Sequence, residues 1–167
     1  MLDKLPLPAK EHSSLMSRTL EIVENGYISD LFPFYQTRYN YDSKKYESDS
    51  VHTVESLLTI LSLAEMDKAP GASLRFIKQE VLHGALYGAY SLTGQPQNDI
   101  QSTAIYALAA MIGSKTGDRE LYEAALGRMH AYRVEAQASP LYGSYGDAAS
   151  GQAYSFDNLM ALLAYRY

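Results

Sequence analysis

The sequence has 167 residues and contains neither cysteine nor tryptophan. The absence of cysteine excludes disulfides and thiolate metal sites, and it leaves the redox compartment open. No apolar run approaches the roughly 18 residues that a membrane-spanning helix requires. The net charge is −5, with no run of lysine or arginine, which argues against a nucleic-acid-binding surface. We therefore expect neither a membrane span nor a nucleic-acid partner.

Several functional motifs are also absent. The first residues, MLDKLPLPAKEHSS, lack the apolar core of a signal peptide, so we expect a cytoplasmic location by default. The glycine-rich segment over residues 143–147 has no lysine, which a phosphate-binding loop needs. There is no Gly-x-Ser-x-Gly elbow of a serine hydrolase. The four histidines are not paired at metal-ligand spacing, so we expect no metal and no cofactor.

The chain is instead rich in tyrosine, with 15 of them, and it repeats a tyrosine motif. The segment LYGAY over residues 86–90 recurs as LYGSY over residues 141–145, and Gly-Gln and an apolar run follow each copy. A looser copy occupies residues 34–46. Aromatic residues flank a turn-forming cluster in each copy, which predicts a short β-hairpin or an extended loop.

Two kinds of helix alternate with these motifs. Apolar residues surround most of the circumference in residues 50–65, 100–113 and 156–165, which predicts buried helices. An acidic residue, Asp49, Asp99 or Asp157, stands near the start of each, as is typical of helix N-termini. Helices with a single apolar stripe are predicted between them, around residues 16–23, 74–81 and 118–132. A unit of buried helix, outer helix and hairpin repeated about every 50 to 55 residues is typical of an α-helical toroid or solenoid.

Two segments carry a resemblance to a known family. The segment SDSVHTVES over residues 48–56 and the ending YSFDNL over residues 154–159, together with the order of the hairpins, resemble the C-terminal half of glycoside hydrolase family 8-like proteins. The family's fold is an (α/α)6 toroid of twelve helices, and the family cleaves β-linked polysaccharides with inversion. The resemblance therefore implies an all-α half-toroid of about six helices with short β-hairpins at one end. It also implies a single domain over residues 1–167. The Leu5-Pro6-Leu7-Pro8 segment separately leads us to expect that residues 1–12 form an extended N-terminal arm that covers one flank.

The resemblance implies a catalytic residue as well. Inverting glycosidases need a general acid and a general base roughly 6.5–9.5 Å apart. The family's general acid lies in a part of the fold that has no counterpart here, whereas the position of its general base matches Asp49. His52 stands where the family has an arginine, and a histidine supports a neighbouring carboxylate only when it is protonated.

The residues around Asp49 have alternative interpretations. Asp49, His52 and Glu55 are spaced by three, so they adjoin one another around the start of a helix. Asp49 either caps this helix while His52 and Glu55 satisfy each other, or the three line a cleft, or, least favoured, they bind a metal. Glu55 also begins a polar stripe with Thr59 and Ser62, which must find partners or face a cleft.

The aromatic residues offer a second set of candidates. Tyr35, Tyr39 and Tyr41 alternate along an expected strand, so they share one face, and Arg38 lies among them. This face either stacks against sugar rings or seals the top of the helical core. Asp147 either touches a ligand or forms a turn. The tyrosines of the two closest motif copies, Tyr87, Tyr90, Tyr142 and Tyr145, are interpreted as braces of the hairpins.

The expected function is that of a glycoside hydrolase-like domain that acts on or binds β-linked oligo- or polysaccharide. It is expected to be incomplete as a catalyst because the general-acid half is absent. The alternative is a non-enzymatic helical-repeat module that binds carbohydrate or protein. A half-toroid leaves two apolar flanks open, so we expect a second copy or a missing N-terminal half to cover them.

Overall fold

The computed structural model describes residues 9–167, with side chains from residue 13 onward. Helices and short strands form in the following order: α1 (Ala9–Asn25), β1 (Tyr39–Asn40), β2 (Lys45–Tyr46), β3 (Val51–His52), α2 (Thr53–Glu65), α3 (Gly71–His83), β4 (Ala89–Tyr90), α4 (Thr103–Thr116), α5 (Arg119–His130) and α6 (Ser155–Ala164). Most of the expected arm over residues 1–12 lies outside the described residues, and α1 begins at Ala9.

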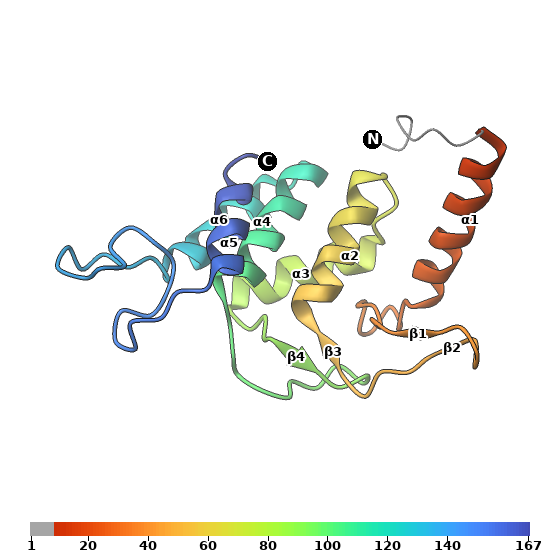
Figure 1. Ribbon diagram of the computed structural model, residues 1–167, viewed down its shortest axis with the longest axis horizontal. Helices are drawn as coiled ribbons and strands as arrows, with labels where there is room; N and C mark the ends of the chain where they lie inside the picture. The colour runs from red at the N-terminus through yellow and green to blue at the C-terminus, as the bar shows by residue number, and fades with distance from the viewer. Residues whose placement is uncertain (1–8) are drawn as a thin grey trace.

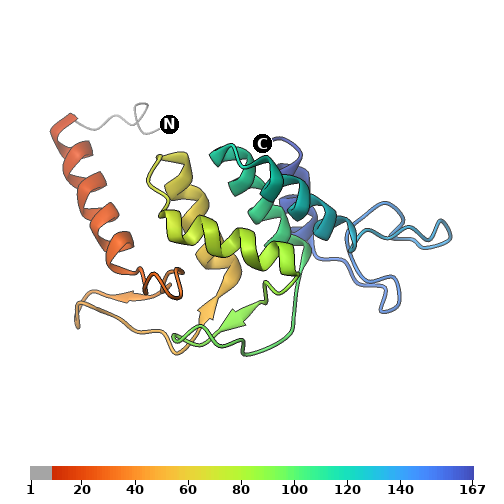
Figure 2. The same cartoon turned by 180° about the vertical axis from the view of Figure 1, so that it is seen from behind.

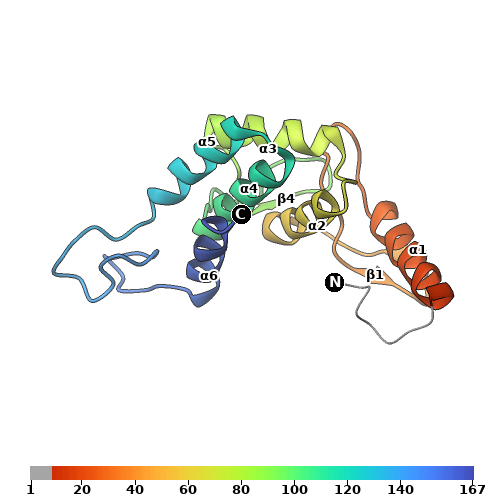
Figure 3. The ribbon, with the colours of Figure 1, turned by 90° about the horizontal axis from the view of Figure 1, so that it is seen from above.

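The helices form a half-ring in two layers. Seen from above, α2, α4 and α6 make an inner row, α3 and α5 lie on its outer side, and α1 stands at one end beyond α2 (Figure 3). The view from behind shows α3 and α5 across the outer side of the half-ring (Figure 2). The central helix, α4, packs against α2, α5 and α6. This arrangement confirms the predicted half of an α/α toroid.

The strands gather at the end of the half-ring where the inner helices begin (Figure 1). The looser motif copy forms the hairpin β1–β2, in which Tyr39 pairs with Tyr46. The strand β4 pairs with β3 from the preceding loop, in the register Val51 to Tyr90, and Tyr90 also forms an isolated antiparallel bridge to Pro96 within its own motif copy. The third copy is an extended loop with isolated bridges from Arg133 to Tyr145 and from Asp147 to Gln152. Each copy thus takes one of the two predicted forms.

The core lies around α4. Every residue of α4 from Thr103 to Gly113 is buried, as its all-round apolar pattern predicts. The outer helix α5 contributes the expected stripe of Leu121, Ala125 and Met129, all buried. The helix α2 begins at Thr53, later than predicted, because Val51 and His52 pair with β4 as a strand. Its side chains Leu57 and Ile60 complete the core beside α4.

The last helix differs from the prediction. The run over residues 156–165 was expected to be buried, yet only Met160, Ala161 and Ala164 of α6 are. These three face α4, while Leu159 and Leu162 are exposed, because no described helix covers the other side of α6. The apolar pattern of α6 is therefore wider than the face that this half-ring buries.

Candidate functional site

The three candidates before and within α2 lie at the hairpin end of the half-ring. Asp49 is exposed in the bend before β3, His52 is the residue that precedes α2, and Glu55 stands in the first helical turn. None of their side chains hydrogen-bonds to, or forms an ion pair with, another side chain or main-chain group among the described residues. The interpretation that Asp49 caps the helix is therefore wrong, as is the pairing of His52 with Glu55. The polar groups of these side chains face solvent.

Glu55 lines a hollow that we call the α2 hollow. The hollow has a volume of about 510 Å³ and lies between α1, the β1–β2 hairpin and α2. Its lining residues are Ile22, Val23, Tyr35, Gln36, Thr37, Arg38, Tyr39, Tyr46, Glu55 and Thr59. The structure thus brings together four of the predicted site residues, from segments that are far apart in the sequence. Asp49, His52 and Tyr41 are not among the lining residues.

Hydrogen bonds within the hairpin hold one wall of the α2 hollow. The carboxylate of Glu47 accepts hydrogen bonds from Asn40 Nδ2 at 3.1 Å and from Ser43 Oγ at 2.8 Å. These hydrogen bonds, together with the charge of Arg38, hold the pKa of Glu47 below its usual value. Arg38 Nε donates to the main-chain carbonyl of Glu47 at 3.1 Å. The guanidinium therefore has donors left over for a ligand, because an arginine carries five N–H groups.

Of the three tyrosines predicted to share one face, Tyr35 and Tyr39 line the α2 hollow, while Tyr41 contacts Tyr39 without lining it. The ring of Tyr39 contacts Tyr41 and Tyr46 edge-on, with centroids 5.3 Å apart in both pairs. Tyr35 precedes the strand, is only 3% exposed and packs against Tyr27. Burial, with the nearby charge of Glu24, raises the pKa of Tyr35 to about 12. Tyr35 therefore seals the floor of the hollow, while Tyr39 and the exposed Tyr41 carry the accessible rings.

The polar stripe of α2 faces the hollow, as one of its two predicted alternatives required. Glu55 and Thr59 line the hollow, and Thr59 Oγ1 donates to the main-chain carbonyl of Glu55 at 3.0 Å. Ser62 lies one turn further on, where it lines an apolar groove between α1 and α2. The hollow thus offers one cation, one anion and an aromatic edge, a set that can hydrogen-bond hydroxyl groups and pack against an apolar ring face.

Asp147 lies apart from the α2 hollow. The loops over residues 131–154 project from the opposite side of the inner helices to the β1–β2 hairpin (Figure 1). The carboxylate of Asp147 accepts from the main-chain N–H groups of Ala149 at 2.9 Å and Ser150 at 3.2 Å. The hydrogen bond of the Ser150 side chain, together with these two main-chain hydrogen bonds, lowers the pKa of Asp147. Asp147 is a turn-forming residue, the second of its two predicted roles.

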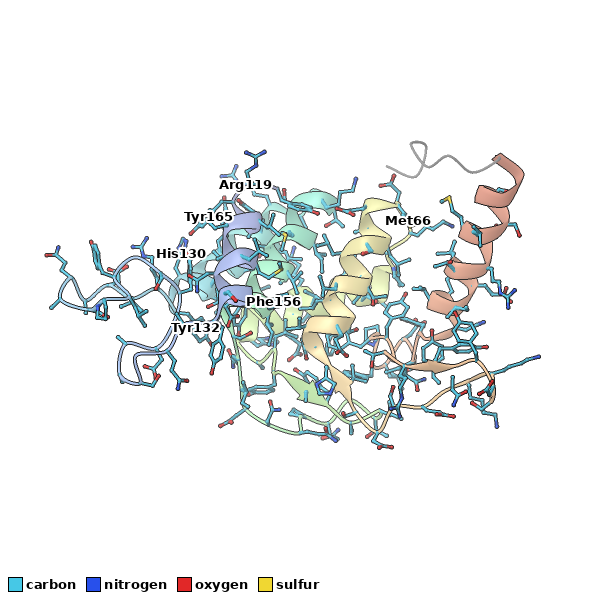
Figure 4. All side chains as sticks on the ribbon, in the orientation of Figure 1. Met66, Arg119, His130, Tyr132, Phe156 and Tyr165 are labelled. Atoms are coloured by element: carbon cyan, nitrogen blue, oxygen red, sulfur yellow. The ribbon has the colours of Figure 1, made fainter. Side chains whose placement is uncertain are left out.

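The repeated tyrosines act mostly as braces. Tyr90 is buried, and its hydroxyl accepts from Tyr87 N–H at 2.9 Å and donates to the carbonyl of Ala85 at 3.0 Å. Tyr145 is buried too, and its hydroxyl hydrogen-bonds to that of Tyr165 at 2.7 Å. Tyr165 lies beside His130 next to α6 (Figure 4). The interpretation as braces is confirmed for Tyr90 and Tyr145, but it is wrong for Tyr142, whose side chain is exposed.

Sequence reasoning missed five residues of the α2 hollow, namely Ile22, Val23, Gln36, Thr37 and Tyr46. The last three belong to the looser motif copy, so the repeat was the signal that could have found them, whereas Ile22 and Val23 belong to α1. Within the part of the chain that the structure describes, no three His, Asp or Glu side chains lie where they could share a metal ion. None of the helices in residues 9–167 has the length and apolarity that crossing a membrane requires. The expected cytoplasmic location stays a prediction.

Comparisons with known proteins give two related chains. No family model matches the sequence. The chain is 30% identical over 147 residues to the "Putative lipoprotein YdaJ" of Bacillus subtilis (strain 168), an alignment that covers 86% of this chain and 38% of that protein. The fold of this chain superposes with a TM-score of 0.88, at 32% identity, on "a novel alpha-amylase from Clostridium perfringens". That match covers 95% of this chain and 48% of the amylase chain. The chain thus has the helical fold of part of a glycosidase and spans less than half of either relative.

Proposed function

We propose that this chain is a carbohydrate-binding part of a glycoside hydrolase, with the α2 hollow as its sugar site. The observation that carries the proposal is the similarity to the C. perfringens amylase, which extends over 95% of this chain at 32% identity. The α2 hollow adds a chemical argument. The ring of Tyr39 can pack against the apolar face of a sugar, and Arg38 and Glu55 can hydrogen-bond to its hydroxyl groups.

Each residue has a proposed role. Tyr39, supported edge-on by Tyr41, packs against a sugar ring, and Arg38 and Glu55 hydrogen-bond to its hydroxyl groups. Asp49 is proposed as the general base of a family 8-like inverting reaction, since it is exposed and close in the chain to the start of α2. No carboxyl group of this chain is assigned as the general acid. Hydrolysis would therefore need a group from a further part of the fold.

The linkage of the substrate is open to test. The sequence resemblance implies β-linked polysaccharide. Because the structural neighbour is described as an alpha-amylase, α-linked glucans are candidate substrates as well. The alternative function is a binding module without catalysis. The absence of a second carboxylate from the lining of the α2 hollow favours this alternative for the isolated chain.

Calorimetric titration with maltohexaose, cellohexaose, xylohexaose and chitohexaose tests the proposal, together with an assay for new reducing ends. We expect one class to bind, and Glu55→Gln to weaken it about tenfold by removing one charged hydrogen-bond acceptor. Asp49→Asn should leave binding unchanged and abolish any hydrolysis. Asp99→Asn is the matched control, since Asp99 is an exposed acid ahead of another inner helix. Binding that survives Glu55→Gln intact would exclude the α2 hollow as the sugar site.

We also propose that a second helical half-ring covers the two ends of this one. One end is the exposed face of α6, with Phe156, Leu159, Leu162 and Leu163. The other is the groove between α1 and α2, about 480 Å³ in volume, lined by Leu15, Met16 and Met66 among others. Figure 4 labels Met66 and Phe156, one from each end. The greater length of both relatives supports a half-ring supplied by the rest of a longer chain, and a second copy can take its place.

A further inference from the structure

A second hollow lies away from the α2 hollow, between two segments of the projecting loops. We call it the loop hollow. It has a volume of about 360 Å³ and is lined by Pro140, Leu141, Tyr142, Ser144, Ala153, Tyr154, Ser155 and Asn158. It shares no lining residue with the α2 hollow. The loops that carry it project from the far side of the inner helices relative to the β1–β2 hairpin (Figure 1).

Two tyrosine rings of the loop hollow are open to solvent. Tyr142 is 57% exposed and Tyr154 is 63% exposed. Neither ring packs against another aromatic ring among the described residues. Within residues 13–167, the only side-chain hydrogen bond of either tyrosine is from the Tyr154 hydroxyl to Gln152 Oε1 at 3.2 Å. Both rings are therefore available, unlike those of Tyr90 and Tyr145, which brace the structure.

The main chain beneath these rings is firmly held. Tyr142 N–H donates to the carbonyl of Ser139 at 3.0 Å, and the next residue, Gly143, donates to Val134 at 2.9 Å. The Asn158 side chain joins the two segments. It donates from Nδ2 to the carbonyls of Tyr145 and Tyr154, and it accepts from Tyr145 N–H at 2.9 Å. A ligand would therefore meet rings whose supporting loops are already ordered, which lowers the entropy cost of binding.

The lining identifies the class of ligand. None of the lining residues is charged, so the hollow offers no partner for a phosphate, a carboxylate or a nucleic-acid backbone. The hydroxyl groups of Ser144, Ser155 and both tyrosines can hydrogen-bond to a neutral ligand. An aromatic ring binds the apolar face of a ligand whose edge is polar, which describes a pyranose. We propose that the loop hollow is a second carbohydrate site, which takes neutral sugar units of an oligosaccharide against Tyr142 and Tyr154.

This inference rests on the proposed function for its choice of carbohydrate, but it uses different residues, so the two can fail separately. The chain lacks tryptophan, so Tyr142→Trp creates a single fluorescent reporter in the loop hollow, and Tyr41→Trp creates one beside the α2 hollow. Each variant is titrated with the neutral hexasaccharides maltohexaose and cellohexaose and with anionic hexagalacturonate. Calorimetry on the unsubstituted chain counts the total binding.

We expect the emission of the Tyr142→Trp variant to change saturably with a neutral hexasaccharide and not with hexagalacturonate. Adding Tyr154→Ala should weaken this binding about tenfold, and Tyr154→Phe should change it less than about twofold, because the ring is kept. A response confined to Tyr41→Trp would overturn the second site and leave the proposed function standing. A response confined to Tyr142→Trp would support the second site and count against the α2 hollow. No saturable binding by calorimetry or fluorescence would overturn the loop hollow as a sugar site, as would equal binding of hexagalacturonate.

Discussion

The carboxylate of Asp118 holds the start of α5 through two kinds of contact. Its Oδ1 accepts from Leu121 N–H at 3.0 Å, which caps the helix, and both oxygens accept from Lys78 Nζ of α3 at 2.9 Å. Partial burial disfavours the charged form, but these hydrogen bonds outweigh it and hold the pKa of Asp118 below its usual value. One residue thus ties two outer helices together.

Two substitutions of Asp118 should distinguish the contribution of the helix cap to stability from that of the negative charge. Asp118→Ala should lower the free energy of unfolding at pH 7 by about 1 kcal/mol, the usual loss for an N-cap, whereas Asp118→Asn keeps a capping oxygen and should lose only a few tenths. Because the folded pKa is lowered, the charge stabilises above the unfolded pKa of about 3.9, and this part is lost as pH falls through the folded value.

Urea unfolding at pH 7, 5 and 3 measures both effects. The difference in the free energy of unfolding between the unsubstituted chain and the Asp118→Asn variant should shrink toward pH 3. The Asp118→Ala variant should keep the part of its loss in unfolding free energy that is due to the missing cap. A difference that grows as the pH falls would show that the charge of Asp118 destabilises the fold.

Single residues also show where sequence reasoning stopped. Of the three acidic residues at the inner helix starts, only Asp157 accepts a hydrogen bond from a helix N-terminus, and that helix is not its own. Asp157 accepts from Ala104 N–H at 2.8 Å, so it stabilises the start of α4 from the first turn of α6. Ser102 is the residue that caps α4 in the chain itself. Local sequence indicates that a residue can cap a helix, whereas the choice of helix depends on packing.

At the scale of elements, the main chains of α4 and α5 approach closely at Gly113. A Cβ atom added at Gly113 of α4 would lie 2.7 Å from Tyr122 N and 3.1 Å from the carbonyl oxygen of Asp118. Both are main-chain atoms, which cannot give way without moving α5. A Cβ atom added at Gly127 of α5 would instead lie in open space. Gly113 therefore lies in the contact between α4 and α5, whereas Gly127 is an exposed helical glycine that serves as its control.

We expect the two alanine variants to have opposite effects on the free energy of unfolding. Gly113→Ala should destabilise by about 1–3 kcal/mol, because the helices must separate to relieve the overlap. Gly127→Ala should stabilise by about 0.5–1 kcal/mol, because alanine favours a helix over glycine where nothing obstructs it. Thermal unfolding followed by circular dichroism measures both. A neutral Gly113→Ala variant would show that α5 can shift without loss.

The elements also divide into those that the sequence predicts well and those that it does not. The burial of α4 and the stripe of α5 follow from periodicity, because hydrophobic spacing records which face of a helix is apolar. The pairing of β3 with β4 does not, since it joins the segment before α2 to the segment after α3. The α2 hollow was predicted only in part. Glu55 and Arg38 were candidates, but their proximity depends on the packing of the β1–β2 hairpin beside α2, which the sequence does not indicate.

At the scale of the whole molecule, none of the described residues covers the two ends of the half-ring. Leu162 is 67% exposed, and Leu159 lies one turn before it on the same helix. Contiguous apolar surface on a folded domain marks an interface or favours association. The chain spans 48% of the length of its structural neighbour, so in a longer relative more chain is present that can cover these ends.

The isolated chain should therefore associate through its ends. We expect its weight-average mass, measured by light scattering after size-exclusion chromatography, to exceed the monomer mass of 18.5 kDa and to rise with concentration. The double variant Leu159→Asp, Leu162→Asp should stay at the monomer mass, because a carboxylate in the contact would have to lose its hydration. Leu31→Asp is the control, since Leu31 is 94% exposed, does not line the groove between α1 and α2 and is not part of α6. A chain that is monomeric at every concentration would contradict the prediction that its ends associate. Association that persists in the double variant would place the contact outside the exposed face of α6.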